Sequence, residues 1–126
     1  MRQKVEAEGA PEAIGPYSQA IKANGFVFLS GQIPLDPSSG QITALDTVGQ
    51  TNQVMENLKA ILAAEGLTLQ DVVKTTIFLV DLSDFGRVND AYAAYFGSDP
   101  PARSTVQVAA LPKGARVEIE AVAALR

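Results

Sequence analysis

The chain has 126 residues, of which 47% are apolar and 19% charged, a composition typical of one folded globular domain rather than of a disordered chain. It contains neither histidine nor cysteine, which excludes Ser/His/Asp triads, cysteine nucleophiles, disulfides and zinc sites built from imidazole or thiolate. The net charge of −4 and the lack of clustered lysine or arginine argue against nucleic acid as the main partner.

The first predicted element is a β-hairpin within residues 17–34. Two β-rich runs are joined there by Asn24 and Gly25, a pair that strongly favours the tight turn of a two-residue hairpin. The sequence DPSSG, from Asp36 to Gly40, then predicts a second turn or loop, because turns prefer these residue types.

The most regular helical pattern follows this loop. Thr47 and Gln50 resemble a capping box, which predicts that a helix begins there. Gly66 is placed to close the helix. Between these limits five apolar residues recur at helical spacing: Val54, Met55, Leu58, Ile61 and Leu62.

A strand and a second helix come next. The run VVKTTIFLVDL, residues 72–82, is apolar on both faces at its centre, which predicts a strand buried on both sides. The run SDFGRVNDAYAAYFG, residues 83–97, predicts a helix with Ser83 as its N-cap. One stripe of this helix carries its large apolar side chains: Phe85, Val88, Tyr92 and Phe96.

Residues 103–125 indicate two final strands joined through residues 111–114. The predicted order is therefore β-β-α-β-α-β-β, which favours an α+β sandwich with two helices on one face of the sheet. Because the central strand is apolar on its other face too, that face needs a second cover. A monomer would expose a larger apolar patch than is usual, so we expect a homo-oligomer joined through the open sheet faces.

The two final strands are predicted to form a hairpin with a polar face. Matching apolar to apolar side chains pairs Val108 with Val117 across the turn at 111–114. Since side chains alternate along a strand, one face of the hairpin then carries five polar residues: Arg103, Thr105, Gln107, Glu118 and Glu120.

This polar face has two interpretations. Arg103 at the start of its strand is either a solvated edge charge or a clamp for an anion, and Glu118 and Glu120 could equally form a solvated stripe. The spacing of these residues does not decide between the two interpretations.

Several segments carry a resemblance to a known family. The C-terminal run PARSTVQVAALPKGARVEIEA resembles the signature of the RidA/YjgF family of imine deaminases. Further segments that are similar to this family cover nearly the whole chain: AIGPYSQAI, LSGQIPLDPSSG, NLKAILAAEGL and VVKTTIFLVDLSDFGRVNDAYAAYF.

The resemblance implies a fold, an assembly and an activity. The fold would be a chorismate-mutase-like sandwich, with a mixed sheet and two helices on one face, assembled as a homotrimer with the site between subunits. The activity would be hydrolysis of 2-imino acids or their enamines, such as 2-iminobutanoate and 2-iminopropanoate, to 2-oxo acids and ammonia. That reaction would protect pyridoxal-phosphate enzymes from reactive intermediates.

The resemblance also assigns residues to roles. Arg103 matches the family arginine that would pair with the substrate carboxylate, and Glu118 matches the glutamate that would position or deprotonate water. Thr105 stands where many members carry cysteine, and Glu120 is a weaker second candidate for the base. The remaining residues that match the family's substrate-binding positions are Tyr17, Ser30, Gly31 and Asn89.

Two other functions stay open on the sequence alone. One is a non-catalytic trimer that binds or senses small carboxylates, and the other is the endoribonuclease activity attributed to some relatives. Imine hydrolysis needs neither a metal nor an organic cofactor, so we expect none. With no cysteine, no secretory signal and no run of apolar residues long enough to span a membrane, we expect a cytosolic single domain, residues 1–126, without a membrane partner.

Overall fold

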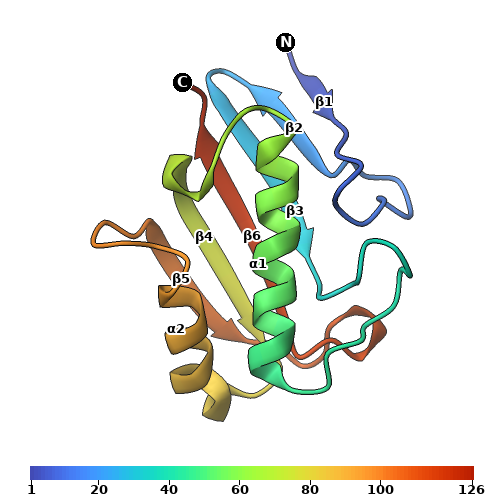
Figure 1. Cartoon of the computed structure of the whole chain (residues 1–126), viewed down its shortest axis with the longest axis vertical. Coiled ribbons are helices and arrows are strands. Elements are labelled where there is room, and N and C mark those ends of the chain that lie inside the picture. Colours follow the sequence, from blue (N-terminus) through green and yellow to red (C-terminus); the bar gives the residue numbers. More distant parts are fainter.

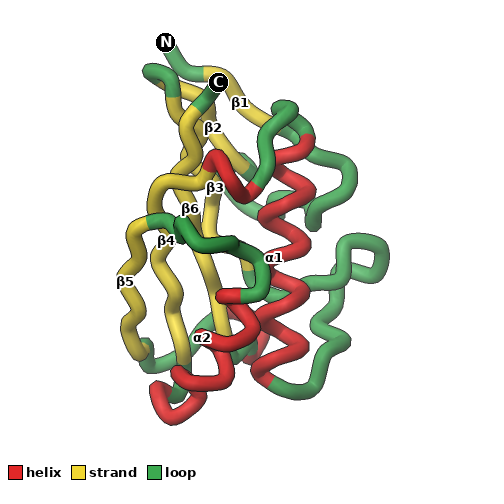
Figure 2. Tube along the Cα trace, turned by 60° about the vertical axis from the view of Figure 1, so that its left-hand side comes forward, coloured by secondary structure: helices red, strands yellow, loops and turns green.

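Six strands form one sheet, and two helices lie on one of its faces (Figure 1). The computed structural model describes residues 1–126. Viewed from the side, the sheet and the helices make two separate layers (Figure 2). The helices are α1 (Thr47–Ala63) and α2 (Phe85–Ala93). The strands are β1 (Gln3–Val5), β2 (Ala20–Ala23), β3 (Phe26–Gln32), β4 (Val72–Leu79), β5 (Ala102–Gln107) and β6 (Val117–Ala124).

The sheet is mixed, with the strand order β1-β2-β3-β6-β4-β5. β4 and β5 are parallel, and every other neighbouring pair is antiparallel. The α+β class and the two helices on one face were predicted and are confirmed. The short edge strand β1 was not predicted, because three residues are too few to show a periodic pattern.

The predicted hairpin between the last two strands is wrong. β5 pairs with β4 in parallel, and β4 separates it from β6. The physical reason lies in burial: Val117 and Ile119 of β6 are fully buried, whereas no residue of β5 is. A strand with such an apolar stripe belongs at the centre of the sheet, where both neighbours and a helix can cover it. Nine residues, 108–116, carry the chain past the end of β4.

The hydrophobic core lies between the sheet and α1. A cluster of 23 buried residues includes Ile77 and Leu79 of β4, together with the inward side chains of β6. The five apolar residues that predicted α1 all have an exposed fraction of 1% or less, so that prediction is confirmed. Val88, Tyr92 and Phe96 are buried as predicted, but Phe85 stays 39% exposed.

Several local predictions are confirmed and two helix starts are corrected. Asn24 and Gly25 both have positive φ, as a two-residue hairpin turn requires, and Gly66 with φ +69° follows the end of α1. The loop at 36–40 also forms. The N-cap of α1 is Asp46, whose side chain accepts from Gly49 N–H, and not a box at Thr47.

The start of α2 also differs from the prediction, and here too an aspartate is the capping residue. Asp81 caps a short 3-10 turn, Leu82–Asp84, that leads into α2, so Ser83 is not the N-cap. An aspartate carboxylate accepts backbone N–H groups as readily as a serine hydroxyl, and here it stands two residues earlier.

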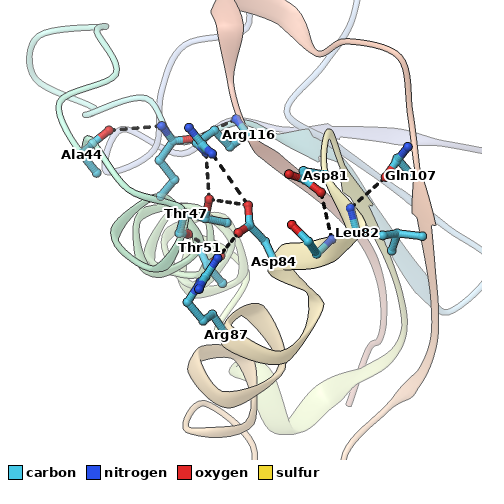
Figure 3. Close-up of polar contacts among 11 residues, drawn as sticks. Ala44, Thr47, Thr51, Asp81, Leu82, Asp84, Arg87, Gln107 and Arg116 are labelled. Atoms are coloured by element: carbon cyan, nitrogen blue, oxygen red, sulfur yellow. Dashed lines mark hydrogen bonds and ion pairs between the residues drawn. The ribbon is translucent and has the colours of Figure 1, made fainter.

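A buried carboxylate joins α2 to the start of α1 (Figure 3). Asp84 accepts hydrogen bonds from Arg87 at 2.5 Å and from the Thr47 hydroxyl at 2.9 Å. Arg116 donates from Nε to the same hydroxyl at 2.9 Å. The bonds from Arg87 and Thr47 hold the pKa of Asp84 below its usual value. This network therefore fixes α2 relative to the rest of the fold.

The end of β5 is tied to the turn that precedes α2. Leu82 N–H donates to Oε1 of Gln107 at 2.8 Å (Figure 3). Gln107 therefore serves a structural contact on the helix side of the sheet. Together with the Asp84 network, this contact holds α2 against β5, the strand that carries Arg103.

The face of the sheet opposite the helices has no cover within the chain. Phe28 is 47% exposed and Val106 42% exposed, and both lie on this open face. Phe78 is only half-buried, so β4 is not buried on both sides in a single chain as predicted. No helix is both long and apolar enough to cross a membrane.

Candidate active site

A cavity of about 640 Å³ lies where β3 and β6 meet the loops on the open side of the sheet. It brings together Tyr17, Ser30, Gly31 and Glu118, four of the residues assigned from the family resemblance. Glu120 lines it as well. The register of β3 against β6 shifts between Leu29 and Gln32, and this bulge turns Ser30 and Gly31 toward the cavity.

Glu118 is a half-buried carboxylate without a partner. It makes no hydrogen bond and no ion pair with any other residue of the chain. Burial raises the pKa of Glu118 above its usual value, and the negative charge of Glu120 raises it further. A carboxylate in this state is a better proton acceptor than a solvated one, which suits a general base.

Gly31 leaves the space that Glu118 occupies. A Cβ atom placed on Gly31 would lie 2.9 Å from the carboxyl carbon of Glu118 and closer still to its Oε2. No other residue type fits there without moving the carboxylate. Glu118 can therefore take this position only because residue 31 is a glycine. The spacing of residues in the sequence did not reveal this contact.

Tyr17 enters the cavity from the N-terminal loop. Its side chain is 52% exposed and its hydroxyl has no hydrogen-bond partner in the chain. Gly15, at φ +120°, makes the turn before it, a conformation that favours glycine. Ser30 differs from Tyr17, because its hydroxyl donates to the carbonyl of Ser18 at 2.6 Å. Ser30 can therefore offer a ligand only an acceptor.

Arg103 lies on the other side of the sheet, between two aromatic rings. Its guanidinium carbon is 5.2 Å from the ring centre of Tyr92 and 5.6 Å from that of Phe85. Tyr92 is itself fixed by a buried 2.6 Å hydrogen bond with Thr75. No aspartate or glutamate pairs with Arg103 in the chain. Two ring faces thus hold a cation that remains free to bind an anion.

Asn89 and Thr105 belong to the surroundings of Arg103. Asn89 is half-buried on α2, four residues after Phe85 and three before Tyr92, so it shares the stripe that faces Arg103. Thr105 is two residues after Arg103 on the same face of β5, and its buried hydroxyl has no hydrogen-bond partner. In the single chain that hydroxyl is fully buried, so a ligand does not reach it in this arrangement.

The structure separates the predicted polar face into two groups. Arg103 and Thr105 are in register with Thr75 and Ile77, which face the helices. Glu118 is in register with Phe78 and faces the open side. The prediction that Arg103 and Glu118 share a face is wrong, because it assumed that β5 and β6 are neighbours. β4 lies between β5 and β6, so the two strands are about 10 Å apart across the sheet, and the side chains of Arg103 and Glu118 point to opposite faces.

The cavity contains further residues that the sequence did not indicate. Glu12, Ile14 and Lys113 line it, and Lys113 takes the left-handed conformation, φ +57°, in the turn before β6. Phe85 and Tyr92 were predicted only as core residues, although the same apolar stripe could have indicated a cradle for Arg103. No group of three or more Asp, Glu, His or Cys side chains is placed to hold a metal ion.

The two groups have complementary chemistry. An unpaired guanidinium can bind a carboxylate through two parallel hydrogen bonds, and an unpaired carboxylate of raised pKa can take a proton from water. Within one chain they cannot act on one small molecule. A site that uses both would need a second chain to bring Arg103 against the cavity that holds Glu118.

Comparisons with known proteins agree with the geometry. Residues 7–125 match the family described as endoribonuclease L-PSP. The chain is 50% identical over 123 residues to the mouse protein named 2-iminobutanoate/2-iminopropanoate deaminase. The alignment covers 98% of this chain and 91% of the mouse protein.

Solved structures are also similar to this chain over almost its whole length. RidA from an Antarctic Psychrobacter bacterium is 45% identical with a TM-score of 0.94, over 98% of this chain and 99% of that one. TdcF of E. coli, solved with bound serine, is 44% identical with a TM-score of 0.93, again over 98% and 99% of the two chains.

Proposed function

Since the chain belongs to the endoribonuclease L-PSP family, which is the RidA/YjgF family, we propose that it is a hydrolytic deaminase of 2-imino acids and their enamine tautomers. Its substrates are small acids such as 2-iminobutanoate and 2-iminopropanoate, and its products are 2-oxo acids and ammonia. The observation that carries this proposal is the pair of unpaired, half-buried charges, Arg103 and Glu118.

Each charge has a role in the reaction. Arg103 binds the substrate carboxylate and orients the C=N bond. Glu118 takes a proton from water as the water oxygen bonds to the imine carbon, and passes that proton to the imine nitrogen to give a carbinolamine. Glu118 then takes the proton of the carbinolamine hydroxyl and passes it to the same nitrogen, so that the C–N bond breaks, the carbonyl forms and ammonia leaves. Tyr17, Ser30 and Gly31 shape the cavity around the reacting carbon.

The site is completed by a second copy of the chain in a homotrimer. Arg103 of one subunit, with Asn89 and Thr105, meets the cavity of its neighbour that contains Glu118. The exposed apolar side chains of the open sheet face, Phe28 and Val106 among them, support burial against another copy. The trimer works in the cytosol as an assembly of single-domain subunits and protects pyridoxal-phosphate enzymes from reactive imines.

Two alternatives make different use of the same residues. A trimer that only binds small carboxylates would need Arg103, but a glutamate beside an anionic ligand would weaken binding and serve no purpose. An endoribonuclease, the activity in the family's description, would have to bring phosphate to a cavity lined by Glu12, Glu118 and Glu120. Repulsion between these carboxylates and phosphate makes that use unfavourable.

The test couples threonine dehydratase, which releases 2-iminobutanoate, to this protein and follows the appearance of 2-oxobutanoate. Wild-type protein should accelerate ketone release, and Arg103→Ala should not. Arg126→Ala is the matched control, because Arg126 pairs with Asp71 on an exposed surface far from the cavity. If wild type does not accelerate release, or if Arg103→Ala equals wild type, the proposed function or its site is wrong.

A further inference from the structure

The loop that carries Tyr17 packs Ala7 and Ala10 into the core, and it is hydrogen-bonded to the fold through one buried side chain. Gln19 is 8% exposed. Its Oε1 accepts from Ala7 N–H at 2.7 Å, and its Nε2 donates to the carbonyls of Ala7 at 3.1 Å and Pro11 at 2.8 Å. All three bonds go to the backbone of the loop, at two separate points.

No other group ties this loop to the rest of the chain by hydrogen bonds. Within residues 7–17 the remaining backbone bonds are local, from Ala10 N–H to Ala7 and from Tyr17 N–H to Gly15. The Ser30 hydroxyl holds only the end of the loop, at Ser18. Every hydrogen bond between residues 7–17 and another part of the chain therefore passes through the Gln19 amide.

The same loop forms one wall of the cavity that contains Glu118. Glu12, Ile14 and Tyr17 line the cavity, and the side chain of none of them makes a hydrogen bond or an ion pair. Ile14 is 73% exposed and Tyr17 52% exposed. The core contacts of the loop, at Ala7 and Ala10, come before this wall begins. The bond from Gln19 to Pro11 is the last hydrogen bond to another part of the chain before Glu12 and Ile14, so it holds the backbone where the wall starts.

We propose that Gln19 is a positioning residue, which fixes the loop so that Tyr17 faces the substrate beside Glu118. This inference rests on the proposed function, because it assigns Gln19 an effect on imine hydrolysis through Tyr17. Gln19 also lines the cavity, but both ends of its amide are already bonded to the loop backbone. Its amide is needed because it both accepts from and donates to the loop backbone, which no apolar side chain of the same length can do.

The test is a double-mutant cycle on imine hydrolysis. Gln19→Leu should lower kcat/KM by about 10- to 100-fold, the loss expected when a site group is displaced by about 1 Å. In a Tyr17→Ala background the same substitution should lower kcat/KM by less than about threefold, since the residue through which it acts is already gone.

A matched control separates positioning from a loss of stability. Gln50 is also a buried glutamine that bridges two backbone segments, accepting from Arg116 N–H at 2.8 Å and donating to the Ala44 carbonyl at 3.2 Å. It does not line the cavity. Gln50→Leu should lower Tm by about as much as Gln19→Leu, yet leave kcat/KM within about threefold of wild type.

The outcomes are distinct. If Gln19→Leu leaves kcat/KM within about threefold of wild type, or lowers it equally with and without Tyr17, the positioning role is wrong and the deaminase function stands. If wild type itself does not hydrolyse the imine, both proposals fail. Should Gln19→Leu not fold, Gln19→Met carries the same test, because its unbranched side chain keeps the length of glutamine and lacks the amide.

Discussion

Arg103 and Glu118 are both half-buried charges without partners, yet the chain builds their surroundings in different ways. Arg103 is held by regular elements: it belongs to β5, and two aromatic side chains of α2 lie against its guanidinium. One of these, Tyr92, is buried and hydrogen-bonded to Thr75 of β4. Glu118 faces a bulge of β3 and loops, which are joined to the rest of the chain at the cavity by a few hydrogen bonds.

This difference indicates how substitutions should act. Where the site is supported by the core, a change should lower both stability and substrate binding. Where it is supported by loops and a bulge, a change at Glu118 or Gly31 should lower catalysis with little effect on stability. The predictions that follow test this contrast, beginning with the largest effect.

The largest effect is expected at Glu118, the proposed base. Glu118→Gln keeps the size of the side chain but cannot accept a proton from water, so kcat should fall by about 10²- to 10⁴-fold. Tm should stay the same or rise, because burial beside Glu120 makes an ionised carboxylate unfavourable in the folded chain. Steady-state kinetics and calorimetry measure both effects, and a wild-type kcat would contradict the role of Glu118.

A smaller loss is expected from the glycine that makes room for this carboxylate. Gly31→Ala places a Cβ against Glu118 and should displace it, lowering kcat by up to about 100-fold. Gly97→Ala is the control, because nothing lies within 4 Å of a Cβ there and its φ is not positive. Equal activity of the two variants would show that the position of Glu118 does not matter.

On the arginine side, two substitutions of Tyr92 should separate stability from binding. Tyr92→Leu removes a ring from Arg103 and leaves a cavity, so Tm should fall and KM should rise by about 2- to 30-fold. Tyr92→Phe keeps the ring and should lower stability by about 1 to 3 kcal/mol, because the Thr75 hydroxyl loses its partner. Equal KM values for the two variants would contradict a binding role for the ring.

The smallest effect is a shift in pH dependence. The charge of Glu120 raises the pKa of Glu118, so Glu120→Gln should lower that pKa. Because the base must be ionised, the acid limb of the kcat/KM profile should then move to lower pH. Glu12 and Lys113 line the same cavity and remain in both proteins, so they do not alter the direction. An acid limb that moves to higher pH would exclude Glu118 as the base.

Local patterns in the sequence predicted the elements of the fold well. The spacing from Val54 to Leu62 identified α1, and the pair Asn24-Gly25 identified the first hairpin, because each signal depends on residues close together in the chain. The pairing of β5 and β6 could not be found in this way. Alternation shows which side chains share a face of a strand, but it does not show which strand lies beside it.

The site illustrates the same limit. Family resemblance selected the residues that the structure places in two groups, but the assumed hairpin put Arg103 and Glu118 on one face. The contact between Gly31 and Glu118 and the rings around Arg103 depend on three-dimensional approach between distant segments. No spacing rule within one segment could have revealed them.

Mixing of subunits tests most directly whether two chains form one site. Arg103→Ala and Glu118→Gln proteins should each be inactive, but after they are unfolded together in equal amounts and refolded, hybrid trimers should form. A cyclic trimer then pairs an intact Arg103 with an intact Glu118 at about one quarter of its interfaces, so about one quarter of wild-type activity should return. If both charges acted within one chain, the mixture would stay as inactive as its two components, and the shared site would be refuted.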